Sequence, residues 1–219
     1  MSKKILIAGS TGMIGKAILS LAINDTKVDE IICLVRRPTQ QQHAKVKEIV
    51  IADFLHYSEH RETFKNVAVL YYCVGVYTGT VNRETFRKIT IDYPLALAEA
   101  VRSASPEMAM VLLSGQGADR TEKSRLSFAL DKGKVENRLT QLLNTRFYSC
   151  RPGYIYPSKR RKEPTITYVI SRYLYPLIRI MGPKYSITSA ALATAMYRIG
   201  QTLPQQNYFE NDALRQWSS

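Results

Sequence analysis

The residues best placed by type and spacing to do chemistry are three glycines near the amino terminus. In the stretch KKILIAGSTGMIG, Gly9, Gly12 and Gly15 follow a short apolar run and precede an apolar segment of helical period. A strand that ends in such glycines and leads into a helix lets backbone approach a pyrophosphate, which then lies at the positive end of the helix dipole. This context predicts a dinucleotide site, the alternative being a glycine-rich turn in another kind of α/β protein. The predicted phosphate-binding residues are Gly9, Ser10, Thr11, Gly12, Met13, Ile14 and Gly15.

Two arginines follow the second apolar run of the chain and indicate which dinucleotide is bound. A protein that binds NAD usually has an acidic residue here, which bonds the adenosine ribose hydroxyls, whereas this sequence has Arg36 and Arg37. Guanidinium groups form bidentate, charge-assisted hydrogen bonds with a phosphate. The pair therefore favours NADP(H), and the alternative is a solvated basic turn.

Further candidate residues follow the next two apolar runs. Asp53 could bond the adenine amino group with Phe54 against the ring, or Asp53 could equally cap a short helix after it. The run 67–74 shows no alternation, which is typical of a strand buried on both faces of a parallel sheet. It ends at Gly75, and Tyr77 follows in a glycine-containing segment that can bring backbone close to a ligand.

Alternating strands and helices must position these residues. The alternation of predicted strands with helices indicates an α/β fold with a doubly wound parallel sheet, the Rossmann fold, whose ligand lies at the carboxyl ends of the strands. The length of 219 residues and the ordinary composition fit a single domain, 1–219. The predicted strands are 5–8, 30–35, 46–51, 67–74, 108–113 and 147–151, and the predicted helices are 13–24, 83–103 with a kink at Pro94, and 127–144.

The chain from 157 onward departs from this alternation. It begins with a basic loop, SKRRKEP, whose role the sequence does not indicate, and continues with an apolar, aromatic stretch that contains two arginines and a proline. Such a stretch is a poor membrane span, so we expect the region 157–202 to form helices that cover the substrate side, a membrane-surface helix being the alternative. These expectations comprise helices within 165–182, an amphipathic helix at 189–202 and a polar tail at 207–219.

Charge and cysteine content restrict the partners. The formal charge of +13 could attract nucleic acid, but no helix-turn-helix, RNP-like or zinc pattern accompanies it, so we do not expect nucleic acid as a partner. An anionic ligand or a solvated surface accounts for the charge equally well. Cys33, Cys73 and Cys150 lie in apolar runs without metal-ligand spacing, and no secretory segment opens the chain. We therefore expect buried reduced thiols, no metal site and a cytoplasmic protein.

As an ordered set, the motifs resemble the atypical short-chain dehydrogenase/reductases. The similarity is greatest to the Tat-interactive-protein-like oxidoreductases and more distant to NmrA-like proteins. The resemblance implies a Rossmann fold that binds NADP(H), with Ser114 on the substrate side and Lys132 on the nicotinamide ribose. It also implies cofactor contacts at Cys73, Val74, Gly75, Pro152, Gly153 and Tyr154. The motifs that carry it are GSTGMIG, Arg36 with Arg37, Asp53, CVG at 73–75, LLSGQGAD around Ser114, KGKVE at 132–136 and RPG at 151–153.

One departure from the family pattern bears on catalysis. In the family's Y-x-x-x-K pattern the phenol exchanges a proton and the lysine lowers its pKa, but Phe128 stands four residues before Lys132 and cannot ionise. Tyr77 or Tyr154 could reach the substrate instead, each with an alternative role as a wall or core aromatic. Lys132 could also act directly if burial lowers its pKa.

Two functions remain open at this point. The first is an NADP(H)-dependent reductase that moves hydride to an unknown small carbonyl, enone or flavin-like acceptor, with Ser114 orienting the substrate and Lys132 holding the ribose. The alternative, prompted by Phe128, is a non-catalytic sensor that binds NADP(H) and acts through a protein partner. The sequence does not indicate the substrate or the oligomeric state.

Overall fold

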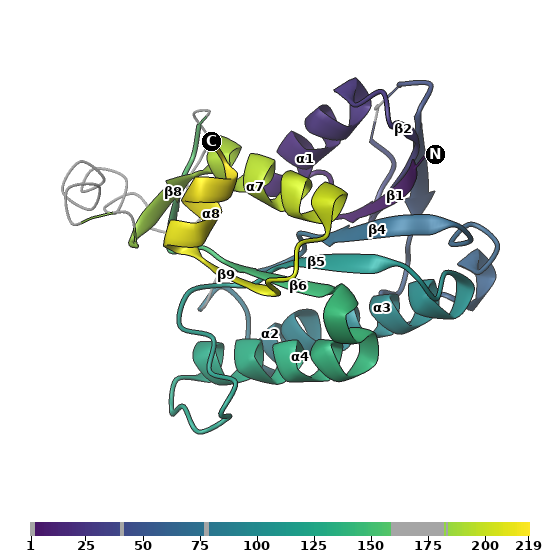
Figure 1. Cartoon of the computed structure of the whole chain (residues 1–219). Coiled ribbons are helices and arrows are strands. Elements are labelled where there is room, and N and C mark those ends of the chain that lie inside the picture. Colours follow the sequence, from purple (N-terminus) through teal and green to yellow (C-terminus); the bar gives the residue numbers. More distant parts are fainter. Residues whose placement is uncertain (1–2, 40–41, 77–78, 159–181, 183) are drawn as a thin grey trace.

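A seven-stranded parallel sheet is the centre of the protein, with the strand order β3-β2-β1-β4-β5-β6-β9. The computed structural model describes residues 3–39, 42–76, 79–158, 182 and 184–219 (Figure 1). The predicted doubly wound Rossmann sheet is confirmed, and its order reverses between β1 and β4. The strands are β1 (Lys3–Ala8), β2 (Val28–Val35), β3 (Val46–Val50), β4 (Val67–Tyr72), β5 (Ala109–Leu113), β6 (Phe147–Arg151) and β9 (Tyr208–Glu210).

Helices cover both faces of this sheet (Figure 1). One layer comprises α1 (Met13–Asn24), α7 (Ser189–Thr202) and α8 (Asn211–Trp217), and the other comprises α2 (Arg83–Arg87), α3 (Tyr93–Ala104) and α4 (Ser127–Leu143). Short 3-10 helices occupy Ser58–His60 and Asn144–Arg146, and β7 (Tyr154–Tyr156) pairs in parallel with β8 (Ser186–Thr188) outside the main sheet.

The apolar runs are continuous because both faces of the central strands are buried. In β4, Val69 and Tyr71 belong to the core under α1 and α7, whereas Leu70 and Tyr72 belong to the core under α3 and α4. All four side chains are at most 1% exposed. Side chains that alternate between two buried layers leave no polar position in the strand, which is the pattern that the sequence shows.

The helix predicted over 83–103 is interrupted before Pro94 rather than at it. Residues Lys88–Asp92 form a π-helical segment between α2 and α3, and Pro94 lies in the first turn of α3. The backbone before Pro94 is helical, and a proline removes the bond to the carbonyl four residues before it, which here lies within the π-helical segment. The irregular turn is therefore in keeping with the backbone bond that Pro94 was predicted to interrupt.

The prediction of a polar tail at 207–219 is wrong, because this segment forms a strand and a helix. β9 extends the sheet by pairing with β6 from Ser149 opposite Tyr208 to Arg151 opposite Glu210, and α8 follows directly. Phe209 and Leu214 have mostly polar neighbours in the sequence, yet both side chains are fully buried in the apolar core. An element this short has too few apolar positions to show a period, so only its place beside β6 makes it a strand.

The helix predicted at 189–202 is confirmed as α7. It packs against α1 and over β4, β5 and β6, so it is part of the layer on one sheet face. The basic loop and the helices expected within 165–182 fall on residues outside the described ranges, so a cover of the substrate side by 157–202 stays a prediction. In the ranges described above, no helix has both the length and the apolar character needed to span a bilayer.

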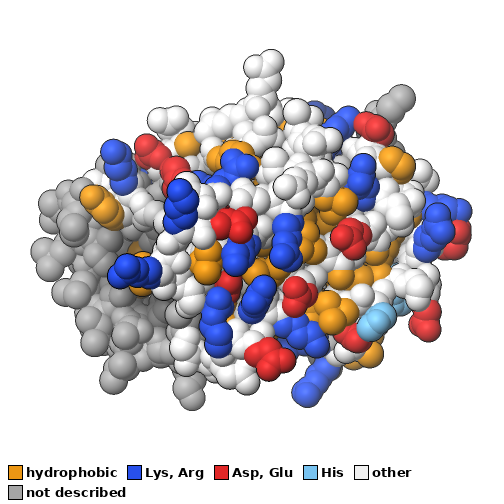
Figure 2. Space-filling view, turned by 90° about the horizontal axis from the view of Figure 1, so that it is seen from below, with side chains coloured by type: hydrophobic (Ala, Val, Ile, Leu, Met, Phe, Trp, Pro, Cys, Tyr) orange, Lys and Arg blue, Asp and Glu red, His pale blue; other side chains and the backbone are white. Residues whose placement is uncertain are grey.

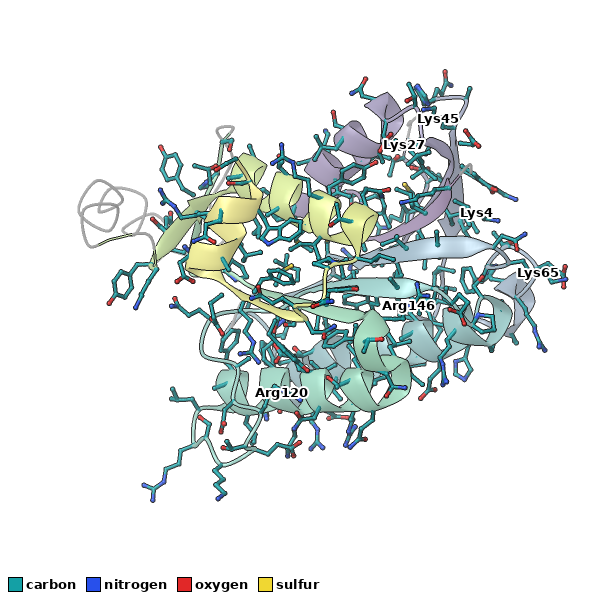
Figure 3. All side chains as sticks on the ribbon, viewed as in Figure 1. Lys4, Lys27, Lys45, Lys65, Arg120 and Arg146 are labelled. Carbon is teal, nitrogen blue, oxygen red and sulfur yellow. The ribbon has the colours of Figure 1, made fainter. Side chains whose placement is uncertain are left out.

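The basic side chains are dispersed rather than gathered in one stripe. The lysines and arginines labelled in Figure 3 lie at separate places around the molecule, most of them in turns and loops. On the face formed by α2, α3 and α4, Figure 2 shows Lys and Arg interspersed with Asp and Glu. Such a mixed surface is typical of a solvated exterior, and the expectation of no nucleic-acid partner stays a prediction. The ion pairs on the surface include Lys4 with Glu30 at 3.3 Å, Lys65 with Glu62 at 2.7 Å and Arg146 with Glu107 at 2.8 Å.

A buried polar contact fixes α7 on the sheet. The Tyr71 hydroxyl donates to the carbonyl oxygen of Tyr197 at 3.0 Å and accepts from Gln201 Nε2 at 3.0 Å. A Cβ on Gly200 would lie 2.4 Å from the same hydroxyl oxygen. Only glycine leaves room for the phenol, so this residue sets how closely α7 approaches β4.

We predict that Gly200→Ala destabilises the protein by about 1–3 kcal/mol, because the added methyl overpacks the contact with Tyr71. Urea unfolding at neutral pH measures the change in the free energy of unfolding. Gly75→Ala is the matched control, since no atom lies within 4 Å of its added Cβ. Equal stability of both variants and the unmodified protein would contradict this account of α7.

Candidate cofactor and active site

The glycine turn joins the end of β1 to the start of α1, and it packs so closely against the first turn of α1 that no side chain fits between them. Gly9 has a φ of +87°, and a Cβ on Gly15 would lie 2.2 Å from the Gly9 carbonyl oxygen. Helix α1 begins after Gly12 with no side-chain cap and no acidic residue in its first turn. Its first N–H groups therefore have no side-chain acceptor, which is the arrangement that binds phosphate.

The end of β4 forms the second wall of this site. A Cβ on Gly9 would lie 2.9 Å from the carbonyl carbon and oxygen of Cys73 and 3.0 Å from the nitrogen of Val74. The structure thus brings the glycine turn and the predicted segment 73–75 into direct contact. No atom lies within 4 Å of the position of an added Cβ on Gly75, so the space beside this residue is open. Tyr77 lies outside the described residues.

A basic cleft adjoins the start of α1. Its volume is about 540 Å³, and Thr11, Arg36, Arg37, Pro38 and Thr39 line it. Both arginines are exposed, and within the described part of the chain neither is in an ion pair with a carboxylate. Two guanidinium groups with no acidic partner there give the cleft the charge that an anionic ligand needs.

Asp53 and Phe54 lie at the end of β3, as predicted. The Asp53 carboxylate accepts from the backbone N–H of Leu55 at 2.9 Å and pairs with the His56 ring at 2.8 Å. The Leu55 bond is the main cause that lowers the pKa of Asp53. Phe54 is 8% exposed and stacks on Tyr93 with ring centroids 5.5 Å apart. These contacts form a local turn, and the roles of both residues toward adenine stay predictions.

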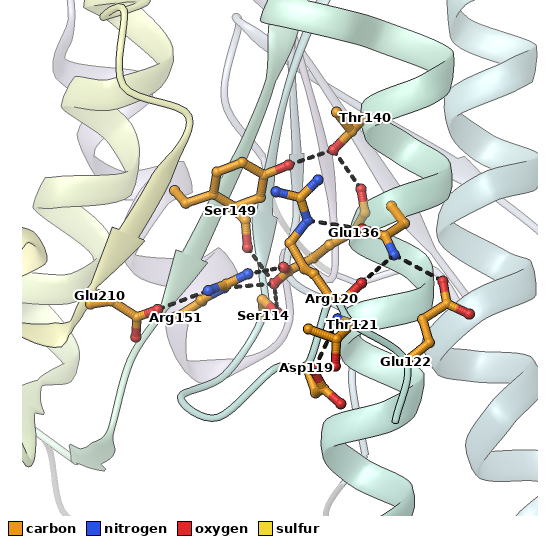
Figure 4. Close-up of polar contacts among 12 residues, drawn as sticks. Ser114, Asp119, Arg120, Thr121, Glu122, Glu136, Thr140, Ser149, Arg151 and Glu210 are labelled. Atoms are coloured by element: carbon orange, nitrogen blue, oxygen red, sulfur yellow. Dashed lines mark hydrogen bonds and ion pairs between the residues drawn. The ribbon is translucent and has the colours of Figure 1, made fainter. Parts of the chain in front are cut away.

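Ser114 is part of a buried polar network at the end of β5 (Figure 4). Its hydroxyl donates to Glu136 Oε1 at 2.6 Å, and Ser149 donates to the same oxygen at 2.7 Å. Arg151 forms a two-pronged ion pair with the Glu136 carboxylate and reaches Glu210 at 2.9 Å. Glu136 is fully buried, and these partners compensate for the loss of its hydration.

Lys132 and Phe128 lie beside this network on α4. Lys132 Nζ donates to the carbonyl oxygen of Leu113 at 3.3 Å. Because Leu113 directly precedes Ser114, the amine lies close to the backbone of Ser114. Burial lowers the pKa of Lys132 to about 8, and Glu136 acts in the opposite direction. The Phe128 ring lies over Gly115, where its Cζ is 2.7 Å from the position of an added Cβ. The ring therefore meets the loop with the carbon that carries the hydroxyl in tyrosine.

The RPG segment connects three parts of the site. The carbonyl of Pro152 accepts from the N–H of Gln116 at 2.9 Å, and the N–H of Gly153 donates to Asn211 Oδ1 at 2.8 Å. The N–H of Tyr154 donates to the carbonyl of Tyr185 at 2.8 Å, where β7 meets β8. Tyr154 thus belongs to a strand at the same edge as Ser114, and its contact with a cofactor or substrate stays a prediction.

Several residues that organise this site were not predicted from the sequence. Glu136 and Arg151 belong to the motifs KGKVE and RPG without a predicted role of their own, and Ser149 is predicted only as part of a strand. The spacing of Lys132 and Glu136, four residues apart in a helix, is the signal that places both on one face. Asp131 is buried and bonds to Arg83 of α2, and nothing in the sequence near Asp131 indicates this ion pair.

A Rossmann sheet with a glycine turn before α1, a basic cleft, and Lys132 of α4 beside Ser114 at the end of β5 is the arrangement of the short-chain dehydrogenase/reductase type. The chain belongs to the NAD dependent epimerase/dehydratase family, whose sequence model matches residues 5–166. The predicted kinship with the short-chain dehydrogenase/reductases is thereby confirmed, with NAD(P) as the cofactor of the family.

Individual relatives agree with this assignment. Protein FMP52, mitochondrial, of Debaryomyces hansenii is 30% identical over 159 residues, which cover 72% of this chain and 69% of that protein. Protein fmp52, mitochondrial, of Emericella nidulans is 27% identical over 166 residues, covering 73% and 70%. The crystal structure of Candida albicans Gre2 in complex with NADPH shares the fold, with a TM-score of 0.68 at 12% identity over 95% of this chain and 78% of that chain.

The names of these relatives contradict the prediction of a cytoplasmic protein, which we correct accordingly. The prediction depended on the expectation of reduced cysteines and on the lack of a recognisable secretory segment. Cys33 and Cys150 are buried and Cys73 is half-buried, and burial raises the pKa of each thiol. Packing alone accounts for their reduced state, so the cysteines carry no information about the compartment.

We predict that Glu136→Gln destabilises the protein by about 3–5 kcal/mol, because it leaves the largely buried Arg151 guanidinium without its inner counter-charge. Glu210→Gln removes the outer partner of the same arginine. Because the Glu210 side chain is 48% exposed, this loss should cost at most about 1 kcal/mol. Denaturant unfolding at neutral pH compares the two variants. A similar loss in the free energy of unfolding for both variants would contradict the larger contribution predicted for the buried Glu136–Arg151 pair.

Proposed function

We propose that the protein is an NADP(H)-dependent oxidoreductase that transfers hydride to a small acceptor. The observation that carries the proposal is the cleft that Arg36 and Arg37 line together with Thr11 of the glycine turn, without carboxylate partners in the described part of the chain. A 2′-phosphate is the feature by which NADP differs from NAD, and two free guanidinium groups are the chemistry that binds it. The NADPH in the Candida albicans Gre2 structure is consistent with this choice.

The glycine turn fits the rest of such a cofactor. The pyrophosphate would contact residues 9–15, where a Cβ on Gly15 would fill the space that lets the turn close on α1. Lys132 would hold the nicotinamide ribose, and the strand-end segments would line the two rings. The proposed contacts along those segments are Asp53, Phe54, Cys73, Val74, Gly75, Pro152, Gly153 and Tyr154.

The bound cofactor supplies hydride, and the chain positions the acceptor. Ser114 orients the acceptor from the end of β5, where Glu136 fixes the direction of its hydroxyl. Lys132 contributes a positive charge beside it, and Phe128 with Gly115 forms an apolar wall that excludes water. A lysine of lowered pKa beside a fixed serine supports a reacting site over a purely binding one.

The relatives also suggest a place of action. Because the FMP52 proteins of Debaryomyces hansenii and Emericella nidulans are named mitochondrial, we infer that this protein acts in mitochondria. Fluorescence microscopy of the tagged full-length chain tests this inference, and exclusion from mitochondria would refute it.

We predict that the variant with both Arg36→Ala and Arg37→Ala binds NADPH at least about tenfold more weakly, because each charged hydrogen bond contributes about 1.5–3 kcal/mol. Its affinity for NADH should not change. Calorimetric titration with the two cofactors measures both constants. Arg102→Ala, an exposed arginine on α3, is the control for loss of charge alone. Equal affinity of the unmodified protein for NADH and NADPH would remove the assignment.

A further inference from the structure

The hydroxyl proton of Ser114 is already committed within the protein. Ser114 is 8% exposed, and its Oγ donates to Glu136 at 2.6 Å. The Glu136 carboxylate also accepts from Ser149 and Arg151, so it acts as an acceptor in every contact. Toward a ligand, Ser114 therefore presents lone pairs and no free proton.

Lys132 is the group beside Ser114 that combines a positive charge with protons to donate. Phe128 carries no polar atom, and its ring tip fills the space over Gly115, which leaves little room for a phenolic oxygen there. Among the described residues, Glu136, which acts on the charge of Lys132, and Asp131, its neighbour in the chain, are both already in ion pairs. The partner of Glu136 is Arg151 of β6 and that of Asp131 is Arg83 of α2, and the thiols of Cys73 and Cys150 stay neutral because burial raises their pKa.

This combination suits some acceptors better than others. Hydride addition to an isolated ketone produces an alkoxide, a localised and strongly basic anion that requires an acid in the same step. Hydride addition to a quinone produces a hydroquinone monoanion, whose charge is delocalised and needs only electrostatic stabilisation. A nearby cation in a site of low polarity supplies that stabilisation without a hydroxyl acid.

We propose that the acceptor is a quinone-type compound and that the Lys132 ammonium group faces the oxygen that gains negative charge. The proposal rests on the function proposed above. Hydride, a proton with two electrons, leaves the reduced nicotinamide, which becomes oxidised, and adds to the quinone, which is reduced to the hydroquinone monoanion. Solvent then supplies the proton that completes the hydroquinone.

Steady-state oxidation of NADPH with duroquinone and with cyclohexanone tests the acceptor class. Duroquinone is chosen because its methylated ring does not add protein thiols. We expect duroquinone turnover at least tenfold faster than cyclohexanone turnover. Faster reduction of cyclohexanone would overturn the inference and leave the proposed function intact. NADPH binding without turnover of either acceptor would refute the proposed hydride transfer itself.

The dependence of this turnover on pH tests the role of Lys132. The pKa of Lys132 is about 8, so its ammonium form and the rate should decrease as the pH rises through 8, by about tenfold between pH 7 and 9. Lys132→Met should be slow at both pH values and Lys132→Arg should lose the decrease. A rate independent of pH in the unmodified protein would overturn the assignment of Lys132.

A binding measurement without turnover separates charge stabilisation from chemistry. para-Nitrophenol forms a delocalised phenolate whose absorbance reports its ionisation. With NADP⁺ present, we expect the unmodified protein to lower the apparent pKa of bound para-nitrophenol and Lys132→Met to abolish the effect. Met removes a buried charge at similar length, so this variant should fold, which thermal unfolding checks. The same shift in both proteins would overturn the proposal.

Discussion

The carboxylate of Glu136 is the contact on which the arrangement of the proposed active-site half depends. It joins Ser114 at the end of β5, Ser149 and Arg151 of β6, and through Arg151 the last strand β9. A fully buried carboxylate is tolerated only when its partners replace the lost hydration. The position of α4 is therefore specified by charge and hydrogen bonding as well as by the apolar stripe of Val135, Leu139 and Leu143.

The two halves of the site differ in how their geometry is encoded. The half proposed to bind phosphate consists of close backbone approaches between residues a few positions apart, such as Gly9 with Gly15, so a short motif specifies it. The active-site half consists of contacts between side chains 13 to 22 positions apart around Glu136. Local sequence reveals the first kind of contact and not the second, because the second depends on which strands become neighbours.

The same distinction separates the elements that were predicted from those that were missed. The long central strands and α1, α4 and α7 follow from apolar runs and helical periods because each buries many side chains. β9 and α8 were missed since each depends on a few residues, chiefly Phe209 and Leu214, meeting a neighbour far along the chain. For the π-helical segment before α3, Pro94 is the local signal, and it indicates an irregular turn without specifying its kind.

Phe128 packs closely against its surroundings, and this packing helps to interpret why the chain has phenylalanine where the family pattern has tyrosine. If the site were decaying, its neighbours would be expected to lose their mutual fit, yet Gly115 leaves the space that the ring tip occupies, and any side chain there would collide with it. Ser114 and Glu136 meanwhile form a buried hydrogen bond, and the partly buried Lys132 bonds to the carbonyl of Leu113 beside them. A cation, a serine with a committed proton and an aromatic wall constitute a coherent environment for an anion. This coherence supports a change in the chemistry of the site over a loss of it.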